Sequence, residues 1–294
     1  MKRIIIFLII VSLLSGCSTQ SIDTGAHPIV IGIDYSPSTR LFTESGLFYL
    51  YNGDKVEHTL ISTDGVTVGE AMEKKTGYSY KSVNYALLGA IALGEGALKL
   101  GMHQSLFPLL KWASLPAEDI LVCAAGTALD VVDSKQLPDL LKNASKEGYL
   151  PKTSLKDCMV SIYEGSPILL PYVIKKPAIY INGSAVVENG VITAYYDRAQ
   201  TLLWGLLYYP EGEGVVTAGG VSVQLRSKRT FIKKERRIEL ELSMRLISHG
   251  DPEVFRQALE KALNEFVDNL GCDIICCGIS PLSDASVTVK TKPY

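Results

Sequence analysis

The first stretch of this chain with the pattern of a folded element is His27-Pro28-Ile29-Val30-Ile31-Gly32-Ile33-Asp34-Tyr35. An apolar, β-branched run of this kind, bounded by turn residues, is typical of a β-strand. The turn Ser36-Pro37-Ser38 follows, and residues 40–51 predict a second strand. Asn52-Gly53-Asp54 is a hairpin-type turn, after which residues 56–62 predict a third strand. A folded domain that starts with a sheet is therefore expected from residue 26.

The segment before this sheet has the anatomy of a secretion signal. Met1-Lys2-Arg3 is cationic and Ile4 to Leu14 is apolar, which is the length of a signal-peptide core. A membrane-spanning helix needs about 20 apolar residues. Leu14-Ser15-Gly16-Cys17 ends the run, and a small residue pair directly before cysteine is typical of a bacterial lipoprotein signal. An ordinary secretory signal with an incidental cysteine is the alternative.

The lipoprotein interpretation gives Cys17 a chemical role. We expect its thiol to form a thioether with diacylglycerol, with cleavage before Cys17, because a thiol is the nucleophile suited to this transfer. Two acyl chains anchor a protein stably, since each buried CH2 contributes about 0.8 kcal/mol. The predicted organisation begins with a signal peptide at 1–16 and a tether at 17–25, whose polar residues suit a flexible linker.

Composition limits the classes of partner. The chain has 294 residues and a net charge of −2, which argues against nucleic acid as a partner. No stretch after the signal has the length of a transmembrane helix, since Gly89, Gly94, Glu95 and Gly96 interrupt the apolar segment 86–98. Membrane attachment therefore depends on Cys17.

No cofactor or metal site is predicted. Five cysteines remain besides Cys17, an odd number that cannot pair completely within one chain. Cys272, Cys276 and Cys277 lie close together but lack paired CxxC spacing and a nearby histidine, so buried packing is favoured over metal binding. The sequence contains no P-loop, GxSxG, HExxH or dinucleotide motif. We therefore expect no enzymatic activity and no catalytic residues.

The alternation of strand and helix patterns predicts an α+β fold with two to three small domains. Each domain is expected to be a mixed or antiparallel sheet with packed helices. The predicted divisions are an N-terminal α/β domain at 26–150, a linker with a helix at 151–177, a middle domain at 178–222 and a C-terminal β-β-α-β-β domain at 223–294.

The basic segment 226–237 allows two interpretations. It could bind an anionic partner such as lipid headgroups, or it could form the solvated face and turn of a hairpin. The strand pattern of Ile238 to Leu246, which alternates apolar and polar residues, favours the hairpin. A helix is predicted to follow, with Asp251 as N-cap, Pro252 at the first helical position and one apolar face.

The order of these features resembles the Ger(x)C family, the lipoprotein C subunits of bacterial spore germinant receptors. The resemblance runs over nearly the whole mature chain. It rests on the lipobox at Cys17, the strand from Ile29, the segments Gly65 to Met72 and Leu88 to Leu98, the apolar helix from Arg198 and the C-terminal pattern. The chain departs from the family pattern in two places. Ser18-Thr19-Gln20 replaces a Trp-Asp pair after the lipid cysteine, and the segment after Gly278 is short.

The resemblance implies a non-catalytic subunit of a nutrient receptor in the spore inner membrane. Its partners would be the integral-membrane A and B subunits, and its lipid would insert in the outer leaflet. A scaffold that docks these subunits during nutrient-triggered germination is the resulting hypothesis. A lipid-anchored small-molecule-binding protein is the main alternative. A cell-wall hydrolase is a weaker one, because the sequence lacks a recognisable carboxylate pair or metal set.

Overall fold

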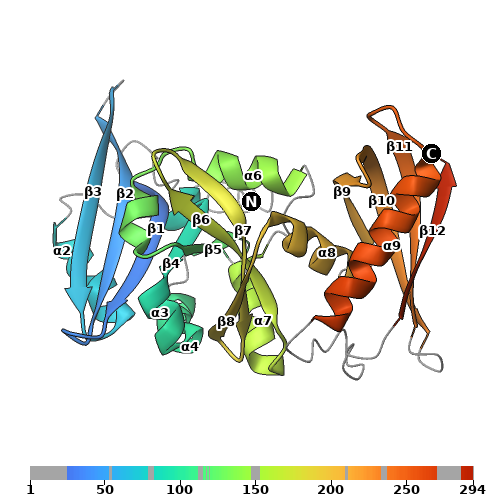
Figure 1. Cartoon of the computed structure of the whole chain (residues 1–294). Helices are drawn as coiled ribbons and strands as arrows, with labels where there is room; N and C mark the ends of the chain where they lie inside the picture. Colours follow the sequence, from blue (N-terminus) through green and yellow to red (C-terminus); the bar gives the residue numbers. More distant parts are fainter. Residues whose placement is uncertain are drawn as a thin grey trace, which may run out of the picture.

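The computed structural model describes residues 25–52, 55–78, 83–111, 115–116, 118, 120–146, 153–208, 211–232, 237–269 and 286–293. These residues form an eight-stranded sheet and a four-stranded sheet (Figure 1). Helices pack against both sheets, so the predicted α+β class is confirmed. Among the residues described, no helix combines the length and apolar character needed to cross a membrane.

The large sheet has the order β3-β2-β1-β4-β5-β6-β7-β8. Its central strands β1, β4, β5 and β6 are parallel, and β2, β3, β7 and β8 add antiparallel hairpins at the two sides. The strands are β1 (Ala26–Ser36), β2 (Leu41–Asn52), β3 (Lys55–Gly65), β4 (Ala90–Gly94), β5 (Ile120–Ala124), β6 (Ile168–Lys175), β7 (Ile179–Glu188) and β8 (Val191–Tyr196).

Strand β1 lies inside this sheet and is buried on both faces. Ile31 and Ile33 pack into one apolar cluster, and Val30 packs into another on the opposite face. Burial on both faces explains why the segment is continuously apolar rather than alternating. The sequence pattern therefore predicts the strand itself, and the structure adds its place inside the sheet.

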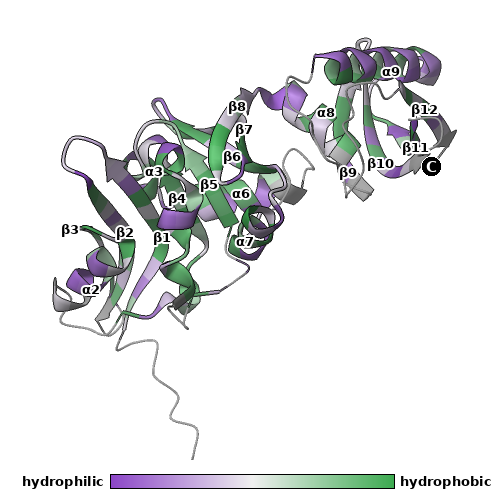
Figure 2. Cartoon of the chain, turned by 90° about the horizontal axis from the view of Figure 1, so that it is seen from below, coloured by the Kyte–Doolittle hydropathy of each residue, from purple (hydrophilic) through white to green (hydrophobic). Residues whose placement is uncertain are grey.

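Helices cover the two faces of the large sheet. The first cluster includes residues of α2 (Val68–Tyr78), η2 (Tyr85–Leu87), α3 (Glu95–Leu100), α4 (Met102–Leu106), η3 (Leu109–Lys111) and α7 (Leu155–Glu164). The second includes residues of α5 (Ala128–Val132) and α6 (Leu137–Lys146). Figure 2 shows apolar residues concentrated along the central strands between these layers.

The sheet continues across residue 177, the predicted start of a middle domain. Strand β6 ends at Lys175 and pairs with β7, where Lys175 lies opposite Ile179. Strands β7 and β8 therefore belong to the same sheet as β1. Strand β6 lies in the segment 151–177, which the sequence predicts as a linker with a helix rather than as a strand. Short-range patterns carry no information about which sheet accepts a strand.

The C-terminal sheet has the order β12-β11-β10-β9. Its elements are β9 (Glu211–Ala218), β10 (Val221–Ile232), β11 (Arg237–Leu246), α9 (Pro252–Asp268) and β12 (Ser286–Pro293). Strands β10 and β11 form the predicted hairpin, with Ile232 opposite Arg237. Asp251 caps α9 by accepting a hydrogen bond from Glu253 N at 2.9 Å, and Pro252 follows it as predicted. Residues 270–285, where the predicted β-β-α-β-β pattern expects its fourth element, lie outside the described residues.

Helix α8 (Arg198–Tyr208) joins the two sheets. Its Trp204 is buried in an apolar cluster that also contains Leu169 and Val186 of the large sheet. The same cluster contains Phe255 of α9 and Leu240 of β11. Figure 1 shows α8 between the sheets, and Trp204 packs in the apolar core that they share.

Candidate functional site

The predicted lipidation site, Cys17, lies outside the described residues, as does the tether up to residue 24. The described chain begins at Gly25, directly before β1. Ala26 lies opposite Leu50 near the β2–β3 turn, so the tether joins the sheet at the amino-terminal end of its parallel strands. Lipidation of Cys17 stays a prediction.

Polar side chains lie together at the opposite end of the sheet, where its parallel strands have their carboxyl ends. Asp34 lies near the end of β1, Glu95 directly follows β4, and Gly126 follows β5. The carboxyl ends of parallel strands lie on the same side of a sheet, and open α/β sheets commonly bind ligands just outside these ends. Residues separated by some 90 positions in the chain are therefore brought together here.

Glu95 is the centre of this polar cluster. Its Oε1 accepts a hydrogen bond from the Tyr172 hydroxyl at 3.3 Å and one from Gly126 N at 3.4 Å, and its Oε2 lies 3.3 Å from Lys99 Nζ. The rings of Tyr172 and Tyr195 lie 4.8 Å apart. This arrangement places a carboxylate beside two phenols.

The two phenols are held in their neutral form. Burial, with the nearby negative charge of Glu95, raises the pKa of Tyr172 to about 12. Burial also raises the pKa of Tyr195, which is nevertheless 43% exposed. Both phenols are therefore neutral at pH 7, and the Tyr172 hydroxyl donates its hydrogen bond to Glu95. A carboxylate flanked by aromatic rings can bind an organic cation.

Asp34 fixes the neighbouring loop. Its carboxylate accepts hydrogen bonds from Ala128 N at 2.7 Å and Leu129 N at 3.1 Å. A Cβ at Gly94 would overlap the Asp34 carboxylate, so glycine is required there. Burial raises the pKa of Asp34, and the two amide hydrogen bonds oppose that rise. Asp34 thereby ties the end of β1 to the start of α5.

A second polar group is fully buried within the N-terminal domain. Glu44 of β2 and Lys75 of α2 form an ion pair, and both side chains are 0% exposed. The Lys75 Nζ also lies 5.1 Å from the centre of the Phe48 ring. Burial raises the pKa of Glu44 and lowers that of Lys75, while the attraction between them opposes both shifts.

Sequence reasoning missed this pair. A lysine near the C-terminal end of a helix is ordinarily exposed, but Lys75 lies inside the core. One signal was present: Glu44 shares its strand face with Phe42 and Phe48, which are buried. A carboxylate at an inward position needs a buried partner.

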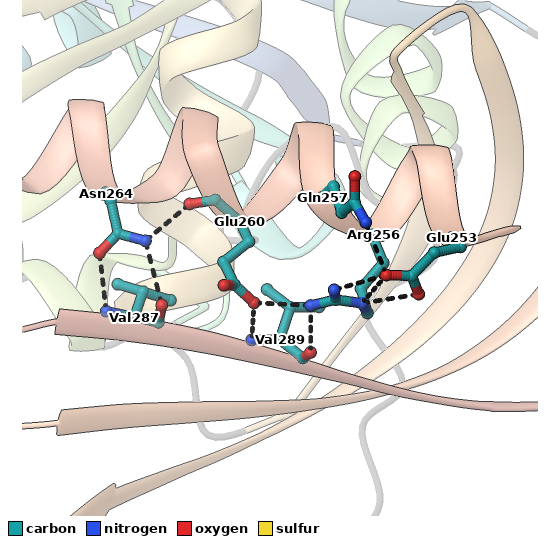
Figure 3. Close-up of polar contacts among 7 residues, drawn as sticks. All are labelled: Glu253, Arg256, Gln257, Glu260, Asn264, Val287 and Val289. Carbon is teal, nitrogen blue, oxygen red and sulfur yellow. Dashed lines mark hydrogen bonds and ion pairs between the residues drawn. The ribbon is translucent and has the colours of Figure 1, made fainter.

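A third group of polar contacts lies between α9 and β12 of the C-terminal sheet and is drawn in Figure 3. Asn264 donates to the Val287 carbonyl at 3.0 Å and accepts from Val287 N at 2.9 Å. Glu260 accepts from Val289 N at 2.9 Å, and Arg256 holds Glu260 at 2.9 Å. Side chains of α9 therefore satisfy main-chain groups of β12 that do not pair with another strand.

The described residues contain no group of three or more side chains arranged to hold a metal ion. His58 contacts the Tyr49 ring at 4.5 Å, and His103 stacks on Phe107 at 4.9 Å. Cys123 and Cys158 are buried free thiols. The predicted cluster of Cys272, Cys276 and Cys277 falls outside the described residues.

Comparison with known proteins identifies a family match over more than half of the chain. The family model described as the spore germination protein N-terminal domain matches residues 18–175. A solved structure described as the crystal structure of the GerBC protein aligns with 13% identity and a TM-score of 0.49, covering 90% of this chain and 96% of that one. No curated protein matches the sequence.

Proposed function

The chain belongs to the Ger(x)C family of spore germination proteins, and we propose that it acts in its germinant receptor as a lipid-anchored, non-catalytic scaffold. Members of this family are the C subunits of germinant receptors. The proposal adds three specific points: the lipid on Cys17, the outer leaflet of the spore inner membrane as its location, and docking of the membrane A and B subunits.

The observation that carries this proposal is the position of the family match. The match starts at residue 18, directly after the predicted lipid-modified cysteine. The same residue is therefore the start of the family domain and the expected first position behind the anchor. This coincidence supports Cys17, rather than an earlier or later residue, as the mature N-terminus.

The architecture supports a docking role. Helix α8 packs with both sheets in one apolar cluster. The two sheets are therefore held together by a shared core. On β10, alternate residues Gln224, Arg226 and Lys228 are exposed on the face opposite that cluster. A charged, polar sheet face of this kind remains in contact with water or with a polar protein surface.

The anchor is tested with Cys17→Ala, and Ser18→Ala is its matched control. We expect Cys17→Ala to leave the spore membrane fraction and to lose nutrient-triggered germination, while Ser18→Ala retains both. Thioether lipidation requires the thiol, and Ser18 contributes none. A Cys17→Ala protein that stays in the membrane and supports germination would contradict the proposal.

The scaffold is tested by crosslinking a tagged copy in dormant-spore inner membrane and recovering it. Recovery of two further receptor subunits, one of them polytopic, is the expected result. Recovery of the tagged chain alone after efficient crosslinking would refute docking.

One observation favours a second candidate, a lipid-anchored small-molecule-binding protein. The cluster of Glu95, Tyr172 and Tyr195 lies at the carboxyl ends of the parallel strands, where α/β folds commonly bind ligands. Calorimetry against a nutrient panel tests this function, with Glu95→Gln as the site variant. Binding that Glu95→Gln abolishes would support it, and the absence of any binding heat would refute it.

A further inference from the structure

Strand β3 ends one side of the large sheet and hydrogen-bonds only to β2 within the described strands. The exposed residues of β3 are Lys55 to His58, Leu60, Ser62 and Asp64. Figure 1 shows β3 as the outermost strand, with α2 beside it. Helix α2 contacts the end of β3, where the Thr63 hydroxyl donates to the Ala71 carbonyl at 2.7 Å.

The outward main-chain groups of β3 can be identified from one contact. Lys74 Nζ of α2 donates to the Asp64 carbonyl at 3.0 Å, which shows that this carbonyl faces away from β2. Main-chain groups of alternate residues point the same way in an antiparallel pair. The main-chain N–H and C=O groups that point away from β2 are therefore those of Val56, His58, Leu60 and Ser62. Among the described residues, these groups have no hydrogen-bond partner.

This exposure contrasts with the edge strand β12. Asn264 and Glu260 of α9 occupy its main-chain groups at Val287 and Val289 (Figure 3). Natural sheets cover or charge their edges because an open edge pairs with other chains. The chain covers one edge in this way and leaves the Lys55–Ser62 part of β3 open.

The side chains of the open edge are also suited to pairing. Val56 and Leu60 are 47% and 40% exposed and lie on one face, four residues apart. Residues 58–63 contain no acidic residue, lysine, arginine or proline. An uncharged segment rich in β-formers on an exposed edge has the pattern that pairs readily with a further strand.

We propose that β3 pairs with β3 of a second copy of this chain, antiparallel and with His58 opposite His58. Outward groups must face outward groups, so even-numbered residues pair with even-numbered ones. Among such registers, the one centred on His58 places Val56 opposite Leu60 of the second copy, and Leu60 opposite Val56. Both exposed apolar side chains are thereby covered at once, which stabilises a cross-strand pair.

The charges fit this register as well. Lys55 lies opposite Ile61 of the second copy, and Glu57 lies opposite Thr59, so no lysine faces a lysine and no glutamate faces a glutamate. A register centred on Leu60 would instead place Val56 opposite Asp64. The self-complementary pattern thus selects a second copy, in one register, as the occupant of the edge. This inference requires neither the lipid nor the other receptor subunits.

Disulfide crosslinking tests the register. The mature chain with Cys17, Cys272, Cys276 and Cys277 replaced by serine serves as background. The variants are His58→Cys and, as matched control on the same exposed face, Ser62→Cys. Opposed residues in a hydrogen-bonded pair have Cα atoms about 5.5 Å apart, within disulfide reach. The two Ser62 positions would be about 27 Å apart at 3.4 Å per residue.

We expect mild oxidation to crosslink His58→Cys into a covalent dimer and to leave Ser62→Cys monomeric. Equal crosslinking of both variants would overturn the register. No crosslinking of either would overturn the pairing.

Sedimentation of the uncrosslinked chain gives an independent measurement. The variant Val56→Lys with Leu60→Lys should be monomeric at concentrations where the parent chain is dimeric, because edge lysines oppose pairing. Tyr163→Lys is the control, since Tyr163 is 91% exposed and lies on α7. A parent chain that stays monomeric, or a dimer that survives the two lysines, would overturn the proposal.

Discussion

Replacement of Lys75 by methionine should destabilise the protein severely. The substitution keeps a long side chain but leaves the Glu44 carboxylate buried without its partner, since both residues are 0% exposed. Removing one member of a buried ion pair typically costs about 3–5 kcal/mol. A whole domain has only about 5–15 kcal/mol of stability, so Lys75→Met would remove a large share of it.

The double variant Glu44→Leu with Lys75→Met separates the charge effect from the loss of packing. Removing both charges also removes both desolvation costs, and such replacements are often neutral or stabilising by about 1–4 kcal/mol. We therefore expect the double variant to be much more stable than Lys75→Met alone. Lys74→Met is the surface control, because Lys74 is 49% exposed in its ion pair with Glu70; it should change stability by at most about 0.5 kcal/mol.

The destabilisation of Lys75→Met should depend on pH. Burial raises the pKa of Glu44, and in this variant the opposing attraction from Lys75 is gone. A carboxyl group with a raised folded-state pKa gives its full stability below the unfolded value of 4.5, and this is lost as pH rises through the folded value. The variant should therefore be closest to the parent in acid and furthest from it at neutral pH.

Urea unfolding followed by circular dichroism, on the mature chain with Cys17→Ser, measures these differences. A loss below about 1 kcal/mol for Lys75→Met at neutral pH would show that the buried charge is compensated in another way. An equal loss in acid and at neutral pH would refute the role of Glu44 ionisation.

Three further substitutions test the other polar contacts. Asn264→Ala should cost about 1–3 kcal/mol and speed amide exchange at Val287, because it leaves the Val287 N–H and C=O without their partner; exchange at the Val287 amide that stays as slow as in the parent would contradict this. Ser154→Ala should cost about 1 kcal/mol in urea unfolding, since Ser154 and Asp157 form a capping box at α7; an unchanged midpoint would contradict it. Asp34→Ala should cost about 1–3 kcal/mol by freeing the amides of Ala128 and Leu129, with Asp133→Ala, an exposed neighbour, as control; equal losses in the two variants would count against it.

Elements with strong local signals could be predicted from the sequence. The C-terminal helix had an apolar face, an aspartate cap and a proline at its first position, and the structure places α9 there. The basic segment was assigned to a hairpin from the alternation in Ile238 to Leu246, and β10 and β11 pair as expected. These signals are local because caps, turns and periodicity involve residues that are neighbours in the chain.

Pairing between distant strands could not be predicted in the same way. Strand β1 lies beside β4, with Val30 opposite Ala90, although some 60 residues separate them. The continuation of the sheet through β7 and β8 depends on the same kind of long-range choice. The Glu95 cluster was missed for this reason, because Tyr172 reaches Glu95 only after β4, β5 and β6 have aligned.

Lys75 shows how a local signal can be present and still mislead. Val68, Met72 and Lys75 follow helical spacing and are all buried, so periodicity taken alone would put Lys75 on the apolar face. Residue type argued for the surface, because lysine is almost never fully buried unless paired. Only the position of Glu44 on the facing strand decides between these two signals. A lysine on an apolar helical face and a glutamate on an apolar strand face are each improbable alone, and together they predict one buried ion pair.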